Sequence, residues 1–129
     1  MARILIVDDE ATDQRILRHI LEEAGHIVFA AWDGEQAYKA YLKNDIDIVV
    51  TDLLMPKVDG IEFIEALLSL FPDASIIAVS GAGEGKLVMA QLEGASATLG
   101  KPIDPSALLE AVSKLAPSGE KDATDDPEV

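Results

Sequence analysis

Short apolar runs alternate along the chain with segments in which apolar residues recur at every third or fourth position. The runs are rich in β-branched residues, and the first is apolar throughout, which is typical of a strand covered on both faces of a sheet. The segments between the runs have the spacing of amphipathic helices. Strands are predicted at residues 4–7, 27–31, 46–51, 75–79 and 97–99. Helices are predicted at 12–24, from the Asp33-Gly34 turn through 42, at 61–71, from the glycine-rich loop at 81–85 through 93, and at 105–115.

Five strands that alternate with five helices predict an α/β domain of the doubly wound (βα)5 class. Right-handed crossovers place such strands in one parallel sheet with helices on both faces, which gives a three-layer sandwich. The apolar face of each helix is expected to pack on the sheet. In the first helix this face is formed by Ile16, Leu17, Ile20, Leu21 and Ala24.

Reactive side chains follow four of the five predicted strands. In such sheets ligands bind beyond the carboxyl ends of the strands, at the point where the strand order reverses. The second strand runs out into Ala31 and Trp32, which offer no obvious reactive group. This pattern matches the order 2-1-3-4-5 of doubly wound sheets, in which the second strand lies at the far edge. The remaining strands run out into Asp8, Asp9 and Glu10, into Asp52, into Ser80 and into Lys101.

These strand ends predict a metal-assisted phosphoacceptor site. Carboxylates brought to one crevice repel one another unless a cation lies among them. Asp9 and Asp52, with a main-chain carbonyl and waters, supply the oxygen shell that Mg²⁺ prefers and leave a position for a phosphoryl oxygen. The Asp52 carboxylate is a competent nucleophile toward phosphorus, since in-line transfer depends mainly on positioning and charge neutralisation. Lys101 and the Ser80 hydroxyl can contact the phosphoryl oxygens.

Composition narrows the classes of function. The 129 residues carry 10 basic and 24 acidic side chains, and the net charge of −14 opposes binding to nucleic acid or to an anionic membrane. The chain has no cysteine and its start lacks the pattern of a signal peptide or a membrane span, so a cytoplasmic location is expected. Acidic residues dominate from Pro117 onward. The predicted organisation is therefore a folded domain at 1–116 and a disordered acidic tail at 117–129.

Together these motifs resemble the receiver domain of response regulators in two-component signalling. The residues that carry the resemblance, which spans 2–116, are Asp8-Asp9 after ILIV, Asp52 before LLMPKVDG, Ser80 ending IIAVS, and Lys101-Pro102 after GASATLG. The resemblance implies that Asp52 is phosphorylated from the histidine of a sensor histidine kinase or a histidine phosphotransfer protein. It also implies that a downstream protein target responds to the phosphorylated state.

The resemblance further assigns a role to each site residue. Asp8, Asp9 and Asp52 would hold Mg²⁺ together with the main-chain carbonyl of Leu54. Ser80 and Lys101 would sense the aspartyl phosphate, and pliability of the 81–85 loop would let it repack. The resemblance also raises the expectation that the Lys101-Pro102 peptide bond is cis.

The chain departs from the receiver pattern at positions that affect switching and lifetime. Thr98 stands three residues before the lysine, where receivers commonly have Tyr or Phe, so an aromatic readout is not expected. The output face is still expected to involve the fourth helix, the fifth strand and the fifth helix. Leu54 and Ala82, two residues after Asp52 and Ser80, have no side-chain group that could hydrogen-bond an attacking water. The phosphorylated form is therefore predicted to decay slowly.

Two other functions are weighed against the phosphorylated switch. A constitutive receiver-like scaffold for protein contacts ranks second. All the groups needed for phosphorylation are present, so this function requires the departure at Thr98 to outweigh an intact site. A phosphatase or phosphomutase ranks third, because such enzymes usually place a second Asp two positions after the nucleophile, and Leu54 stands there. The sequence leaves open whether the protein forms a homodimer, and whether it acts alone or is the first part of a longer regulator.

Overall fold

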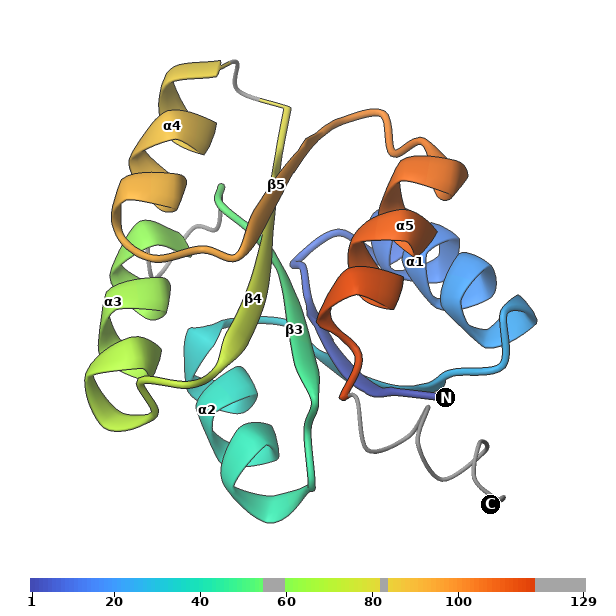
Figure 1. Ribbon diagram of the computed structural model, residues 1–129, viewed down its shortest axis with the longest axis horizontal. Coiled ribbons are helices and arrows are strands. Elements are labelled where there is room, and N and C mark those ends of the chain that lie inside the picture. Colours follow the sequence, from blue (N-terminus) through green and yellow to red (C-terminus); the bar gives the residue numbers. More distant parts are fainter. Residues whose placement is uncertain (55–59, 82–83, 118–129) are drawn as a thin grey trace, which may run out of the picture.

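The centre of the molecule is a five-stranded parallel sheet (Figure 1). The structure, a computed structural model, describes residues 1–54, 60–81 and 84–117. The strands lie in the order β2-β1-β3-β4-β5, and each neighbouring pair is parallel. Their bounds are β1 Arg3–Val7, β2 Ile27–Ala31, β3 Ile48–Asp52, β4 Ser75–Ser80 and β5 Ala97–Gly100. The predicted fold class and strand order are confirmed.

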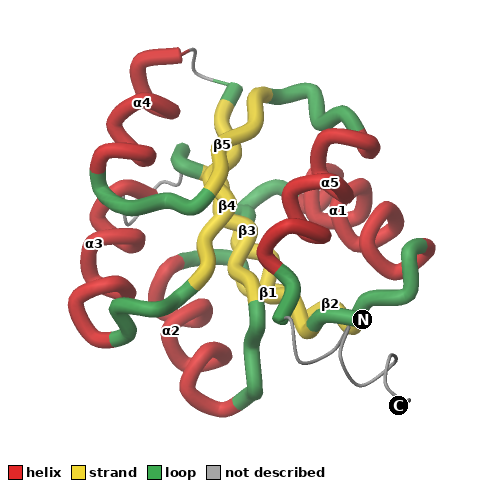
Figure 2. The backbone as a smooth tube through the Cα atoms, in the orientation of Figure 1, coloured by secondary structure: helices red, strands yellow, loops and turns green. Residues whose placement is uncertain are grey.

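Helices cover both faces of the sheet, which makes three layers (Figure 2). α1 and α5 pack on one face, and α2, α3 and α4 pack side by side on the other. The bounds of the helices are α1 Ala11–Glu23, α2 Gly34–Lys43, α3 Gly60–Leu70, α4 Glu84–Leu92 and α5 Pro105–Leu115. The side chains of Asp33 and Asp104 accept hydrogen bonds from main-chain N–H groups in the first turns of α2 and α5.

Successive residues of the central strands supply two separate apolar cores. Leu5 and Val7 of β1 contribute to the core beneath α2, α3 and α4, whereas Ile4 and Ile6 contribute to the core beneath α1 and α5. Alternate side chains of a strand point to opposite faces, so a strand that lies between two cores must be apolar at every position. All four side chains are fully buried, which accounts for the unbroken apolar run at the start of the chain.

Some predicted bounds differ from those in the structure. β3 begins at Ile48 and ends at Asp52, so the predicted phosphoacceptor is itself the last residue of its strand. α4 begins at Glu84, so Gly85 lies in a helix and not in the predicted glycine-rich loop. Residues 82–83 of that loop lie outside the described residues, as do 118–129 of the predicted tail.

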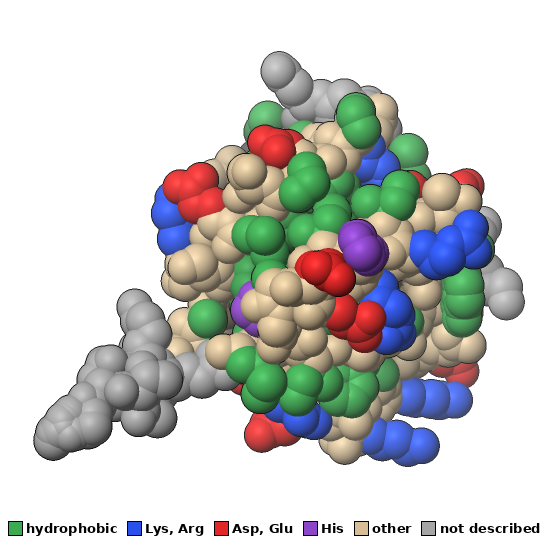
Figure 3. All heavy atoms as spheres, turned by 90° about the vertical axis from the view of Figure 1, so that its right-hand side faces the viewer, with side chains coloured by type: hydrophobic (Ala, Val, Ile, Leu, Met, Phe, Trp, Pro, Cys, Tyr) green, Lys and Arg blue, Asp and Glu red, His purple; other side chains and the backbone are tan. Residues whose placement is uncertain are grey.

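The buried face of α1 is narrower than its apolar pattern predicts. Leu17 and Leu21 are buried, but Ile16 is 45% exposed and Ala24 is also exposed. The third buried position of the helix is the polar Gln14. Residues 14, 17 and 21 are spaced by three and four, which defines a single stripe toward the sheet. Hydrophobic side chains reach the surface on the side of the molecule that carries α1 and α5 (Figure 3).

Gly60 allows α3 to start directly beside the end of β3. A Cβ atom on this residue would lie 2.5 Å from the Leu53 Cα atom and 2.6 Å from the Asp52 carbonyl oxygen. The Gly60 N–H also donates to the Leu53 carbonyl at 3.1 Å. Only glycine permits this approach of one backbone to another. The helix start is thereby fixed against the strand that carries Asp52.

Two further findings bear on the predictions. The Lys101-Pro102 peptide bond is cis, the isomer that the resemblance favoured without deciding it. In the described part of the chain, every helix is too short or too polar to traverse a lipid bilayer.

Candidate functional site

Three carboxylates meet at the carboxyl ends of β1 and β3. Asp8 and Asp9 directly follow β1, and Asp52 completes β3. The two strands are paired in register, with Val7 opposite Thr51, so the residues after them lie side by side. One oxygen from each of the three carboxylates lies within 4.8 Å of the other two. Asp8 and Asp52 are only 1% and 5% exposed.

Main-chain hydrogen bonds fix both buried carboxylates. The Glu10 N–H donates to Asp8 Oδ1 at 2.9 Å, and the Leu54 N–H donates to Asp52 Oδ1 at 3.3 Å. Each carboxylate therefore receives a donor from the residue two positions later in the chain. These local contacts orient the Asp8 and Asp52 side chains at the strand ends.

Gln14 supports the loop that carries the acid pair. Its side-chain amide donates to the Asp8 carbonyl at 2.8 Å and to the Ala31 carbonyl at 2.7 Å, which links the ends of β1 and β2. The sequence reasoning missed this residue. Its position three residues before the buried Leu17 was the available signal, because it places the side chain on the buried face of α1.

Lys101 reaches the acid cluster from the end of β5. It follows β5, and its N–H donates to the Ser80 carbonyl at 3.1 Å. Its Nζ atom lies 3.3 Å from Asp8 Oδ2, 3.5 Å from Asp52 Oδ2 and 2.7 Å from Asp13 Oδ2. The sequence reasoning brought Lys101 to the acids but did not include Asp13, which lies in the first turn of α1.

Burial perturbs the protonation of the site. Desolvation raises the pKa of Asp8 to about 6, although the Glu10 hydrogen bond and the charge of Lys101 oppose the shift. Desolvation also raises the pKa of Asp52 against the hydrogen bond from Leu54 and the charge of Lys101. For Lys101, burial lowers the pKa, but the hydrogen bond to Asp13 and the nearby carboxylates outweigh burial and raise it. The lysine is thus charged at neutral pH.

Ser80 and Thr98 lie on the two strands beyond β3. Ser80 ends β4 opposite Gly100, is 2% exposed, and stands at the same edge of the sheet as Asp52. Thr98 is half-buried in β5 opposite Ala78, two residues before the end of the strand. Asp8, Asp9, Asp52, Ser80 and Lys101 therefore all lie at or near the carboxyl edge of the sheet, while Thr98 lies further inside.

The donor set fits a hard divalent cation. Three carboxylates from two adjacent strands offer oxygen ligands, which are the type that Mg²⁺ prefers. Burial disfavours the charged forms of Asp8 and Asp52, and a cation among them would offset that cost. Among the described residues, the one ammonium group that contacts these acids, that of Lys101, is shared with Asp13.

Comparisons with known proteins agree with this geometry. The sequence model of the family described as the response regulator receiver domain matches residues 4–113. The chain belongs to the response regulator receiver domain family. Receiver domains of this family act as signalling switches in phosphorylation-based two-component systems.

Two relatives of similar length support the family assignment. The chemotaxis protein CheY of Thermotoga maritima is 35% identical over 116 residues, which are 88% of this chain and 97% of that protein. Protein CcdB of Bacillus subtilis is 37% identical over 89% of this chain and 98% of its own length. Both alignments span nearly the whole relative and most of this chain, so the similarity is not confined to a short motif.

Solved receiver structures have the same fold. A response regulator receiver domain protein from Clostridium thermocellum superposes with a TM-score of 0.85 at 29% identity, covering 94% of this chain and 98% of that one. The response regulator protein TrrA from Thermotoga maritima, solved in complex with Mg(2+)-BeF, has a TM-score of 0.82 at 30% identity. That match covers 89% of this chain and 99% of TrrA.

Proposed function

We propose that this receiver domain accepts a phosphoryl group on Asp52 in an Mg²⁺-dependent reaction and thereby switches its contacts with a downstream protein. The donor would be the phosphohistidine of a sensor histidine kinase or of a histidine phosphotransfer protein. The observation that carries the proposal is the position of the Asp52 carboxylate. It ends β3, within contact of Lys101 and beside the acid pair that follows β1.

Asp8, Asp9 and Asp52 would hold the Mg²⁺ ion, together with the main-chain carbonyl of Leu54. When bound, the ion supplies charge neutralisation for the carboxylates and the incoming phosphoryl oxygens. The solved complex of TrrA with Mg(2+)-BeF supports this assignment, because its receiver fold superposes on this one. The three carboxylates of this chain offer the oxygen ligands that Mg²⁺ prefers.

In the transfer step, a carboxylate oxygen of Asp52 forms a bond to phosphorus while the bond between phosphorus and the donor imidazole nitrogen breaks. The electron pair of that bond stays on the imidazole nitrogen, so the donor leaves as a neutral histidine once its protonation equilibrates. The main-chain N–H of Leu54 holds the other carboxylate oxygen of Asp52 and so orients the nucleophile. Lys101 would contact a phosphoryl oxygen with its ammonium group.

Ser80 and Lys101 would report the phosphorylated state to the rest of the domain. Ser80 ends β4 and Lys101 follows β5, so a shift of either side chain toward a phosphoryl group acts on the strands beneath α4 and α5. With Thr98 in place of an aromatic residue, this response would pass through the main chain of β4 and β5. The output face would then be formed by α4, β5 and α5.

Intact-protein mass spectrometry tests the proposal. The protein is incubated with acetyl phosphate with and without Mg²⁺, as the wild type and as Asp52→Asn. We expect the addition of one phosphoryl group that needs both the ion and Asp52. Labelling that persists in Asp52→Asn would place the acceptor elsewhere. Absence of labelling, from acetyl phosphate and from a phosphorylated histidine phosphotransfer protein alike, would overturn the proposal in favour of a constitutive scaffold.

A further inference from the structure

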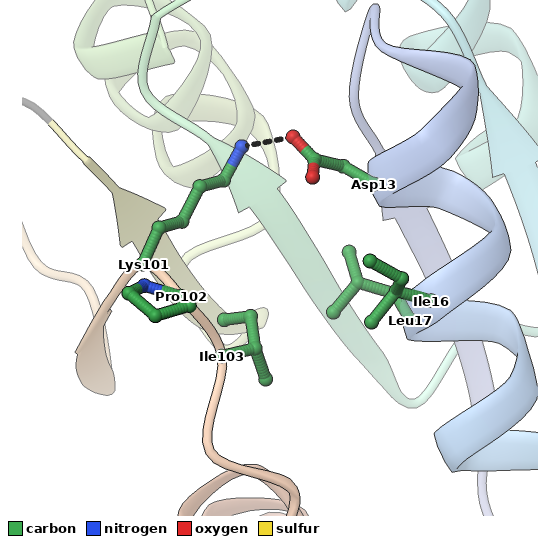
Figure 4. Close-up of a pocket in the computed structure, with 6 residues that line it drawn as sticks. All are labelled: Asp13, Ile16, Leu17, Lys101, Pro102 and Ile103. Atoms are coloured by element: carbon green, nitrogen blue, oxygen red, sulfur yellow. Dashed lines mark hydrogen bonds and ion pairs between the residues drawn. The ribbon is translucent and has the colours of Figure 1, made fainter.

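The Lys101 ammonium is closer to Asp13 than to any acid at the strand ends. The distance from Nζ to Asp13 Oδ2 is 2.7 Å, compared with 3.3 Å to Asp8 Oδ2 and 3.5 Å to Asp52 Oδ2. Figure 4 shows the Lys101 and Asp13 side chains pointing toward each other across a pocket, one from the end of β5 and the other from α1. The lysine is thus shared between the acid cluster and the first turn of a helix.

The Asp13–Lys101 pair is more exposed to solvent than the carboxylates at the strand ends. The side chain of Asp13 is 31% exposed and that of Lys101 is 21% exposed, whereas those of Asp8 and Asp52 are 1% and 5% exposed. Asp13 therefore lies at the rim of the site, and the two strand-end carboxylates lie beneath the ammonium. The pocket on which the Asp13–Lys101 pair borders is otherwise lined by Ile16, Leu17, Pro102 and Ile103.

We propose that Asp13 is a positioning residue that holds the Lys101 ammonium at the rim of the site before phosphorylation, so that Asp8, Asp9 and Asp52 remain available to a divalent cation. The inference deepens the proposed function and rests on it for the identity of the cation. It concerns a carboxylate that the metal-binding and phosphoacceptor roles do not use.

Opposing electrostatic attractions set the position of the Lys101 ammonium. An ammonium ion attracted only by Asp8 and Asp52 would move inward until it contacted both closely, and from there it would repel a divalent cation among the same oxygens. The short hydrogen bond to Asp13 supplies an opposing attraction directed outward. Burial lowers the pKa of Lys101, but the hydrogen bond to Asp13 is the largest of the contributions that raise it above its usual value. The lysine therefore stays charged, and the contact with Asp13 opposes its movement toward Asp8 and Asp52.

The same restraint acts after phosphorylation. A phosphoryl group on Asp52 adds negative charge beneath the ammonium and competes with Asp13 for it. Removal of the Asp13 charge should therefore ease the inward movement of Lys101. The expected consequence is a weaker site for Mg²⁺ in the resting protein and a more readily engaged lysine in the phosphorylated one.

The pairing itself is tested in the metal-free protein. A hydrogen-bonded lysine ammonium exchanges its protons slowly enough at low temperature to give a ¹H–¹⁵N correlation, which Lys101→Met assigns by its loss. We expect the Lys101 signal to shift or disappear in Asp13→Asn and to be unchanged in Asp73→Asn. Asp73 is an exposed residue in the turn before β4, at the other end of the sheet, so its variant removes the same charge far from the site. An unchanged Lys101 signal in Asp13→Asn would overturn the inference.

The effect on the cation is tested by calorimetric titration of Mg²⁺ into a double-mutant cycle of Asp13→Asn and Lys101→Met. Asp13→Asn should weaken Mg²⁺ binding by roughly fivefold, the size expected for the loss of one partly exposed charge pair. In the Lys101→Met background, the same substitution should have a much smaller effect. An equal effect in both backgrounds would show that Asp13 acts directly on the ion and would contradict the inference.

The two experiments separate the inference from the proposed function. If the wild type binds no Mg²⁺, the proposed metal site fails, and with it the role of Asp13 toward a cation. The nuclear magnetic resonance result still decides whether Asp13 holds Lys101. If Mg²⁺ binds and Asp13→Asn leaves its affinity unchanged, the proposed function stands and the inference is wrong.

Discussion

The interior of the sheet and its carboxyl edge share strands β1 and β3 but bury different kinds of side chain. In the interior, Ile6 and Val50 are apolar residues packed against α1 and α5. At the edge of the same strands, Asp8 and Asp52 are almost as fully buried, and burial disfavours their charged forms. Burial thus stabilises the fold in one region and opposes it in the other. The edge is therefore the part of the molecule whose stability a cation or a phosphoryl group can change.

The largest expected effect is in the interior. Ile6→Ala removes a fully buried side chain and should lower the free energy of unfolding by about 3 to 4 kcal/mol, because it leaves a cavity between the sheet and α1. Ile16→Ala is the matched control. Because Ile16 is 45% exposed, this substitution should lower the free energy of unfolding by less than about 1 kcal/mol. Urea unfolding measures both. Similar losses for the two variants would contradict the assignment of Ile16 to the surface.

The pH dependence of the free energy of unfolding should reveal the cost of burying the Asp8 carboxylate at the carboxyl edge of the sheet. The pKa of Asp8 rises from 3.8 to about 6 on folding, so the folded protein binds more protons than the unfolded chain between these values. Stability in the metal-free protein should therefore fall as the pH rises from about 4 to about 6. At about 1.4 kcal/mol per pKa unit, the contribution of Asp8 is about 2 to 3 kcal/mol.

Other carboxylates contribute to the same pH range, so the Asp8 contribution is measured against Asp8→Asn. The neutral amide lacks the charge that burial disfavours. In denaturant unfolding with a chelator present, the variant should match the wild type near pH 4 and exceed it in stability at pH 7. A difference that stays constant with pH would show that the Asp8 carboxyl is not perturbed.

Gln14 connects the two regions, and its loss should have an intermediate effect. Gln14→Leu removes two hydrogen bonds to the carbonyls of Asp8 and Ala31 at the buried ends of β1 and β2. The expected loss is about 1 to 3 kcal/mol of unfolding free energy. Gln36→Leu is the control, because Gln36 is exposed and accepts one hydrogen bond from the Trp32 N–H. Equal losses in thermal unfolding would argue against a special role for Gln14.

The smallest expected effect is on the lifetime of the phosphorylated form. Leu54 is 48% exposed beside Asp52, and its side chain cannot orient an attacking water. Leu54→Asn supplies an amide there and should speed the loss of the phosphoryl group by roughly tenfold. Decay is followed by intact mass after removal of the donor. Leu70→Asn, at an exposed position at the end of α3, should decay like the wild type. An unchanged rate in Leu54→Asn would refute the slow-decay hypothesis.

Part of the fold and part of the candidate site could be predicted from the sequence. The existence of the strands and the convergence of Asp8, Asp52 and Lys101 follow from apolar runs and from the residues after them, because parallel strands bring their carboxyl ends to one edge. The strand order was obtained by matching these ends to an arrangement known for doubly wound sheets. The match of these motifs to receiver domains was confirmed by the family comparison.

Contacts that depend on helix rotation were not predictable in this way. The apolar pattern of α1 placed Ile16 on the sheet, whereas the structure buries Gln14 and turns Ile16 outward. Asp13 was missed for the same reason, since its contact with Lys101 joins residues 88 positions apart and depends on where α1 lies over the strand ends. Periodicity indicates that a helix has a buried face, but packing decides which residues line it.

The central claim is that the edge is held in an unfavourable charged state that a cation relieves. Its most direct test is the free energy of unfolding of the wild type and of Asp52→Asn at pH 7.5, each measured with a chelator and with saturating Mg²⁺. The account predicts that Asp52→Asn is the more stable protein without the ion, because burial raises the pKa of Asp52 and disfavours its charged form, and that Mg²⁺ stabilises the wild type more than the variant. A wild type that is more stable than Asp52→Asn in chelator, and that gains nothing from Mg²⁺, would contradict it.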